Sequence, residues 1–317
     1  MNFLYTIDNR FFVQMMVSIG SLIDVTNKQI SIFVICDEIT DINKRKLNEL
    51  NSDLVNIILL PSPNLPEKLI ADRGSISQFY RIMIGKIFRK INIEKLIYLD
   101  ADTIINSDIG KLFNTDLGPF IIGGALDPWS IKYRKLLKID RDSGMLNSGV
   151  LLINVRKWKN EKLDNKIKKL IGKRKSFIQG DQGILDEIFN GKFLVINPCF
   201  NAISSYFELN INDLKIFRKP HIFYNDELIK SAYNTPVVVH FTGTFMNNRP
   251  WYAGSSHPYK NKWLKQYKKI FKEEFEPVVH AKSISFYLYK LLPNKLAISI
   301  LGFLQNNVRP IWFTLKD

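Results

Sequence analysis

Two aspartates, Asp100 and Asp102, stand one residue apart at the end of the apolar run Lys95–Leu99. In extended backbone, side chains two positions apart point the same way, so we expect the two carboxylates to converge. Carboxylate oxygens suit Mg²⁺ or Mn²⁺, and such a cation in turn holds a diphosphate. Two crowded carboxylates without a counter-ion repel each other, which favours a bound cation. Asp-x-Asp also arises often in solvated turns, so the pair alone leaves both interpretations open.

Four further segments place polar side chains beside apolar runs. Asn147-Ser148-Gly149 precedes a predicted buried strand, and His240 lies near the end of another. Asp181-Gln182 stands at a predicted helix start, and Arg249 precedes Pro250-Trp251. Taken singly, each segment has an ordinary structural interpretation: a turn, a strand-end histidine, a helix cap at Asp181 and a solvated charge.

In this order, the segments resemble glycosyltransferase family 8, the retaining UDP-sugar-dependent transferases with a GT-A fold. That family includes bacterial lipooligosaccharide galactosyltransferases, lipopolysaccharide glucosyltransferases and glycogenin. The resemblance covers roughly residues 1 to 252; beyond them, the chain shares only a basic, aromatic C-terminus with bacterial members. It implies a metal-dependent hexosyltransferase with a UDP-hexose donor, galactose being slightly favoured over glucose.

The resemblance also implies roles for single residues. Asp100, Asp102 and His240 match the metal ligands, and two carboxylates with a neutral imidazole suit Mn²⁺, with Mg²⁺ as the alternative. Arg249 stands where the family generally has lysine, after a loop that is longer than in many members. The other positions matched to the donor nucleotide are Thr6, Asp8, Asn9, Arg81, Ala101 and Gly243. Those matched to the sugar and its anomeric carbon are Asp127, Asn147, Asp181 and Gln182.

Gln182 bears on the expected mechanism. A retaining hydrolase would place a carboxylate nucleophile at this face of the sugar, and a glutamine is a poor nucleophile. The resemblance therefore favours front-face attack, in which the leaving phosphate oxygen takes the acceptor's proton. We expect Asp181 to orient sugar hydroxyls rather than attack. The metal and Arg249 would neutralise the charge that develops on the leaving UDP.

Strand-like and helical segments alternate along the chain, which predicts an α/β fold with a mainly parallel sheet flanked by helices. Ligands of such sheets bind beyond the carboxyl ends of the strands, where Asp8 and Asp100 fall. The predicted strands are Asn2–Ile7, Ile30–Cys36, Leu54–Leu60, Lys95–Leu99, Phe120–Ala125, 145–155, Phe193–Asn197 and Val237–Phe241. The predicted helices are Phe12–Val25, Asp41–Asn51, a lysine-rich one over 157–173, and Asp181–Phe189. The family resemblance identifies this architecture as the Rossmann-like GT-A fold.

After about residue 252, lysines alternate with aromatic residues such as Trp263 and Tyr267, and an apolar stretch follows Pro277. We predict a catalytic domain over 1–252 and a small helical C-terminal region over 253–317. That region would bind the acceptor or lie on an anionic membrane surface. The alternative is a set of helices packed on the catalytic domain or on a partner subunit.

The composition limits the partners. A net charge of +15 in 317 residues favours an anionic substrate or a membrane surface, and no nucleic-acid-binding motif is recognisable. Two isolated cysteines, no signal peptide and no transmembrane stretch predict a cytoplasmic protein, peripheral at the inner face of the membrane. The acceptor would be a lipid-linked or protein-linked saccharide of a surface glycan or glycoprotein.

Two other functions stay open. A sugar nucleotidyltransferase normally has a glycine-rich phosphate loop after its first strand, where this chain reads Asp8-Asn9-Arg10-Phe11-Phe12. A basic membrane- or polyanion-binding module with an inactive transferase fold would not need the carboxylates and the histidine that this chain retains.

Overall fold

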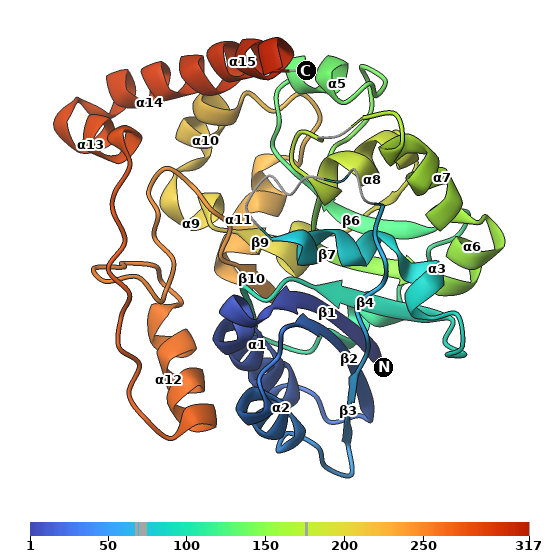
Figure 1. The fold of residues 1–317 in the computed structure, drawn as a ribbon. Coiled ribbons are helices and arrows are strands. Elements are labelled where there is room, and N and C mark those ends of the chain that lie inside the picture. The colour runs from blue at the N-terminus through green and yellow to red at the C-terminus, as the bar shows by residue number, and fades with distance from the viewer. Residues whose placement is uncertain (67–68, 70–74, 175–176, 317) are drawn as a thin grey trace.

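A computed structural model describes residues 1–66, 69, 75–174 and 177–316 (Figure 1). Its centre is a seven-stranded sheet of order β3-β2-β1-β4-β7-β6-β8, in which only β7 is antiparallel to its neighbours. The strands are β1 (Asn2–Asp8), β2 (Ile30–Asp37), β3 (Val55–Leu59), β4 (Lys95–Leu99), β6 (Ile122–Leu126), β7 (Leu146–Asn154) and β8 (Leu194–Val195). Helices cover both faces, and the predicted mainly parallel GT-A sheet is confirmed.

The central strands are apolar because both of their faces are covered. One face packs on α1 (Phe12–Asp24) and α2 (Asp41–Asn48), which is capped by the Thr40 side chain. The other packs on α3 (Ile84–Ile87), α6 (Val155–Asn160), α7 (Leu163–Ile171) and α8 (Asp181–Phe189). The remaining elements of the first 252 residues are η1 (Asn9–Phe11), η2 (Ile76–Ile82), α4 (Gly110–Asn114), α5 (Lys132–Leu136), η3 (Pro198–Asn201), α9 (Ser205–Glu208), α10 (Ile211–Arg218) and α11 (Asp226–Asn234).

The single lysine-rich helix predicted over 157–173 is wrong, because the chain forms two helices there, α6 and α7. Lys162 between them has a φ of 51°, a left-handed conformation that ends one helix before the next begins. Trp158 and Leu163 are buried on either side of this break. Turning the chain at Lys162 therefore lets both apolar side chains reach the same core.

A second, three-stranded sheet has the order β5-β10-β9 and consists of β5 (Thr103–Ile105), β10 (Val238–His240) and β9 (Ala202–Ile203). β10 pairs antiparallel with β5, and this register places His240 opposite Thr103. It therefore brings a histidine from late in the chain beside the Asp100–Asp102 segment, which directly precedes β5.

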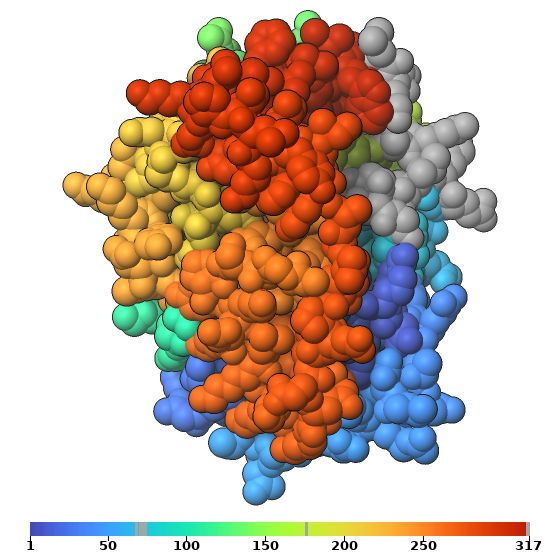
Figure 2. All heavy atoms as spheres, turned by 90° about the vertical axis from the view of Figure 1, so that its left-hand side faces the viewer, coloured from blue at the N-terminus to red at the C-terminus, as the bar shows by residue number. Residues whose placement is uncertain are grey.

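The residues after 252 are mainly helical and pack on the rest of the protein (Figures 1 and 2). The helices are α12 (Lys260–Phe271), α13 (Ile284–Leu291), α14 (Asn294–Phe303), the π-helical turn η4 (Leu304–Val308) and α15 (Arg309–Lys316). α12 lies on α1, where the lack of a side chain at Gly20 admits Gln266 and Ile270. α14 lies on α10, where Gly302 approaches the backbone of Ile216.

None of the helices in the described ranges combines the length and apolar character that a membrane-spanning segment needs.

Candidate active site

A cleft of about 900 Å³ opens beyond the carboxyl ends of β1 and β4. It gathers nearly all of the side chains that the sequence singled out. The predicted site residues that line it are Thr6, Asp8, Arg81, Asp100, Ala101, Asp102, Asp127, Asn147, Asp181, Gln182, His240, Gly243 and Arg249. Asn9 is not part of this lining, and its side-chain oxygen instead accepts a hydrogen bond from Asn43 of α2 at 2.8 Å.

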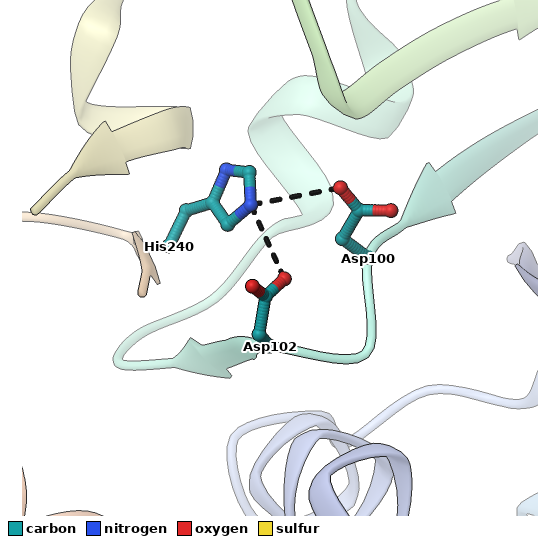
Figure 3. Close-up of side chains that lie close together, drawn as sticks. All are labelled: Asp100, Asp102 and His240. Carbon is teal, nitrogen blue, oxygen red and sulfur yellow. Dashed lines mark ion pairs between the residues drawn. The ribbon is translucent and has the colours of Figure 1, made fainter. Parts of the chain in front are cut away.

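Asp100, Asp102 and His240 converge in this cleft, with one potential ligand atom of each within 4.8 Å of the others (Figure 3). His240 Nε2 lies 3.3 Å from Asp102 Oδ1 and 3.6 Å from Asp100 Oδ2. The expected convergence is confirmed, but its expected cause is wrong. β4 ends at Leu99, and the two aspartates lie in the turn between β4 and β5 rather than in extended backbone.

The chemistry of this donor set fits a divalent cation. His240 Nδ1 is 2.9 Å from Asn201 Oδ1, which can only accept, so Nδ1 carries the proton. In the neutral imidazole, Nε2 is then the nitrogen without a proton, and it faces the two carboxylates in the tautomer that a metal ligand requires. Burial opposes the charged form of His240, but Asp102 and Asp100 raise its pKa overall. The two carboxylates thus favour positive charge at this point, as a site for a cation requires.

Two arginines flank the carboxylates. Arg249 Nη2 lies 3.0 Å from Asp102 Oδ2, and its Nε donates to the carbonyl of Phe241 at 2.9 Å. Arg81 Nη2 lies 2.7 Å from Asp100 Oδ1, and its Nε lies 3.3 Å from Asp181 Oδ2. Burial alone would raise the pKa of Asp102, but His240 and Arg249 lower it overall, so this carboxylate stays ionised. Arg249 and Asp102 therefore form a partly buried ion pair at one side of the cleft.

Asp127, Asn147 and Gln182 form a hydrogen-bonded group next to the triad. Asp127 Oδ2 accepts from Asn147 Nδ2 at 3.1 Å and from Gln182 Nε2 at 3.0 Å. Gln182 Oε1 in turn accepts from the amide of Ser148 at 3.4 Å. These contacts fix both ends of the Gln182 carboxamide, so the group offers a rigid polar surface to a ligand in the cleft.

Asp181 does not cap α8, contrary to the simplest interpretation of its position, because Gly180 holds the cap position. Its Oδ2 instead accepts from Ser148 Oγ at 2.9 Å beside Arg81. Gln179 and Gly180 both have positive φ angles, 64° and 59°, an unfavourable conformation for the glutamine. A strained turn thus brings the helix that carries Asp181 and Gln182 to the cleft. Backbone strain of this kind is common at functional sites.

Sequence reasoning missed three residues that set this geometry. Asn201 Nδ2 donates to Asn147 Oδ1 at 2.9 Å while its own oxygen holds His240, so it links the triad to the Asp127 group. Ser148 joins Asp181 to Gln182. Gly149 of β7 has no room for a side chain, because a Cβ there would collide with the His240 ring. Ser148 and Gly149 stand in the polar segment that the sequence singled out, although no role was given to either; nothing in the sequence distinguishes Asn201.

Comparison with protein families gives one match that spans most of the chain. The model for "Glycosyl transferase family 8" matches residues 2–254. Among curated proteins, a putative glycosyltransferase of Haemophilus influenzae is 29% identical over 269 residues, covering 81% of this chain and 74% of that protein. The lipopolysaccharide 1,2-glucosyltransferase of Escherichia coli is 23% identical over 268 residues, covering 81% of this chain and 75% of that protein.

Solved structures share the fold at lower sequence similarity. The galactosyltransferase LgtC, solved with donor and acceptor sugar analogues, superposes with a TM-score of 0.71 at 21% identity. The match covers 85% of this chain and 96% of that one. The glycosyltransferase GlyE of Streptococcus pneumoniae superposes with a TM-score of 0.59 at 20% identity, covering 86% of this chain and 62% of that one.

Proposed function

We propose a reaction for this chain from the premise that it belongs to glycosyltransferase family 8 and is a glycosyltransferase. The reaction is the transfer of a hexose from a UDP-hexose to a saccharide with retention of configuration. The observation that carries the proposal is the juxtaposition of the Asp100, Asp102 and His240 triad with the Asp127, Asn147 and Gln182 group in one cleft. The first can hold a metal diphosphate and the second can hold the attached sugar.

Asp100, Asp102 and His240 are proposed to hold the metal, with Mn²⁺ favoured over Mg²⁺ because one ligand is an imidazole nitrogen. When bound, the cation supplies electrostatic stabilisation of the charge on the leaving diphosphate. The residues proposed to meet the nucleotide and its phosphates are Thr6, Asp8, Asn9, Arg81, Ala101, Gly243 and Arg249. Of these, Asn9 does not line the cleft, and its side-chain oxygen is engaged by Asn43, so its assignment rests on the family resemblance alone.

The chain's own residues suit a front-face displacement. Arg249 beside Asp102 brings a second positive charge toward the leaving phosphate, where preorganised charge contributes most to the rate. Asp181 already accepts from Ser148 and pairs with Arg81, so it is held as an orienting group rather than a free nucleophile. Gln182, fixed by Asp127 and Ser148, presents an amide to the anomeric carbon. The acceptor oxygen bonds to the anomeric carbon as the bond from that carbon to the phosphate oxygen breaks. The released phosphate oxygen takes the proton of the acceptor hydroxyl.

We propose galactose as the hexose, slightly ahead of glucose, and a lipid-linked or protein-linked surface saccharide as the acceptor. LgtC is by its name a galactosyltransferase and the Escherichia coli relative a glucosyltransferase, so both sugars occur among proteins similar to this one. The two hexoses differ in the orientation of one hydroxyl, which a group such as Asp127 would read by hydrogen bonding.

The proposal is tested by slow hydrolysis of nucleotide sugars in the absence of an acceptor. Purified protein is incubated with UDP-galactose, UDP-glucose and matched GDP- and ADP-sugars, with Mn²⁺, with Mg²⁺ or with a chelator. We expect UDP release from one UDP-hexose, fastest with Mn²⁺ and lost with the chelator. No release from any donor, together with no thermal stabilisation by UDP and Mn²⁺, would contradict the proposal and favour a binding module.

We propose further that residues 253–317 form the acceptor and membrane side of the protein, with peripheral attachment to an anionic cytoplasmic surface. Large apolar side chains on α13 and α14 are exposed, among them Ile284 at 81%, Leu291 at 81% and Phe303 at 60%. Lys290 and Lys295 are exposed in the same segment. Apolar side chains bordered by lysines are typical of helices that lie in an anionic membrane surface.

Replacing Ile284 and Leu291 together with serine is expected to reduce binding to anionic vesicles severalfold, because two exposed apolar anchors are lost. Co-sedimentation with phosphatidylcholine vesicles, with and without phosphatidylglycerol, measures the change. Ile42→Ser is the matched control, since Ile42 is 69% exposed on the distant helix α2. Equal binding by the wild type and the double variant would exclude this surface. Removing the whole region is a poorer test, because it would uncover the buried Trp251 and Gly20.

A further inference from the structure

The cleft extends past the Asp127 group to a wall that carries two arginines and an indole. Trp129 follows Asp127 closely, and its backbone amide donates to the Asp127 carbonyl at 2.8 Å. Arg218 ends α10 and Arg309 begins α15, and both line the cleft together with Trp129. A smaller cavity of about 270 Å³ adjoins this wall and is lined by the same two arginines, by Gly243 and by Thr244.

The two guanidinium groups lie against the same ring. The central carbon of Arg218 is 4.9 Å from the centroid of Trp129, and that of Arg309 is 5.5 Å from it. Phe217 flanks Arg218 at 5.1 Å and Phe313 flanks Arg309 at 5.4 Å. Stacked guanidinium planes keep their N–H edges free for hydrogen bonding, the geometry that recognises a phosphate or carboxylate.

Arg218 makes no hydrogen bond and no ion pair with any residue in the described ranges, and its Nε is covered and without a partner. Arg309 makes one, from Nη1 to Gln305 Oε1 at 3.3 Å. Burial and the neighbouring Arg309 lower the pKa of Arg218, although Asp127 and Glu208 oppose this. The two arginines therefore hold their positive charges close together without a carboxylate of the described residues paired to either guanidinium group. Such an arrangement costs free energy unless an anion binds between them.

The wall is also rigidly built. Buried Asn306 in the π-helical turn donates to the carbonyls of Phe217 and Gly302, at 2.8 and 2.7 Å, and so ties the start of α15 to the end of α10. Tyr133 of α5 donates to the Gln305 carbonyl at 2.9 Å, and Lys132 donates to Asn307 at 2.7 Å. A π-turn inside a helical run often marks a functional position. Here it determines where Arg309 enters the cleft.

We propose that Trp129, Arg218 and Arg309 form an anion-binding subsite for the acceptor, which takes a phosphate or carboxylate group carried by the acceptor saccharide. The inference rests on the proposed function, since the Asp127 group is assigned to the donor sugar and the wall lies beyond it. The two arginines bind the anionic substituent of the acceptor, and the buried Trp129 ring holds their guanidinium groups in place by stacking. The cation proposed for the triad, together with Arg249, would supply the positive charge for the donor diphosphate, so Arg218 and Arg309 are available to another anion.

The test compares neutral and anionic saccharides that share a skeleton: lactose with 3′-sialyllactose, and glucose with glucose 6-phosphate. Binding is measured by calorimetry in the presence of UDP and Mn²⁺. We expect at least one anionic member to bind about tenfold more tightly than its neutral partner, and the pair that responds distinguishes carboxylate from phosphate. Equal binding within both pairs, or no binding by either anionic probe, would overturn the proposal.

Arg218→Gln and Arg309→Gln are each expected to remove most of this preference, while Arg309→Lys keeps part of it because charge remains without the planar fork. Lys215→Gln is the matched control, because Lys215 lies on the same helix α10 but forms a surface ion pair with Asp226. This variant is expected to keep the preference for the anionic saccharide. A loss of UDP affinity as large as the loss of anion binding would place the arginines at the donor and refute the subsite. Failure of the proposed function shows separately, as absent UDP release in the wild type.

Discussion

Replacing Asp102 with asparagine is expected to lower Mn²⁺-dependent UDP release by at least about a hundredfold. The substitution removes the carboxylate charge that faces His240 Nε2 at 3.3 Å and Arg249 at 3.0 Å, while keeping the size of the side chain. A metal held by two carboxylates and an imidazole loses much of its electrostatic attraction with one carboxylate gone, and a loss of this size is usual for preorganised charge at a reacting phosphate.

Initial rates of UDP release, with Mn²⁺ binding measured in parallel by electron paramagnetic resonance, provide the check. Gln182→Ala is the informative comparison, because it removes an amide from the proposed sugar pocket and leaves the triad intact. It should lower turnover while Mn²⁺ and UDP still bind, whereas Asp102→Asn should lower both binding and turnover. Turnover by Asp102→Asn at the wild-type rate would show that the metal is held elsewhere.

Gly149→Ala is expected to have the second largest effect on activity, although it removes no chemical group. A Cβ at this position would lie 2.6 Å from His240 Nδ1 and 2.9 Å from Asp100 Oδ2, and closer still to the His240 ring. Neither group can withdraw freely, because His240 is buried and held by Asn201. The methyl group must therefore push the triad apart, with a stability cost of about 1–3 kcal/mol that is typical of overpacking.

The measurement is the apparent dissociation constant for Mn²⁺ together with the midpoint of thermal unfolding. Gly172→Ala is the control glycine, since a Cβ there meets backbone oxygens only at ordinary contact distances of 3.4 and 3.6 Å. We expect Gly149→Ala to stay folded with weakened Mn²⁺ binding and at least tenfold lower turnover. Wild-type Mn²⁺ affinity in that variant would mean that the triad does not act as a metal site.

The sequence predicted most of the sheet because its signals were local. β1, β2 and β4 are continuous apolar runs followed by polar residues, which is what strands buried on both faces require. A threonine directly before a helical pattern is typical of a cap, and the Thr40 side chain accepts from the amide of Asn43, three residues ahead. The break at Lys162 left no such signal, because lysine has no preference for the left-handed conformation that tertiary packing imposes there.

The site divides in the same way. The types of Asp100, Asp102 and His240 fit one metal, and the family resemblance brought them together before any geometry was known. What the sequence could not supply was the orientation of His240, which depends on a contact with Asn201 of η3. Nor could it supply the wall of Arg218, Trp129 and Arg309, whose members come from three separate segments and match no motif.

The pairing of β10 with β5 has a consequence for how the protein folds. Thr103 and His240 are paired in the second sheet but distant along the chain, so assembly of the ligand set requires closure of a long loop, which is a slow step in folding. A cation and nucleotide bound there recognise the native state alone and stabilise it by mass action. We expect the bound cation and nucleotide to contact the native state but not the folding transition state. They should therefore slow unfolding more than they accelerate folding. Bound donor would then prolong the lifetime of the folded enzyme for as long as substrate is supplied.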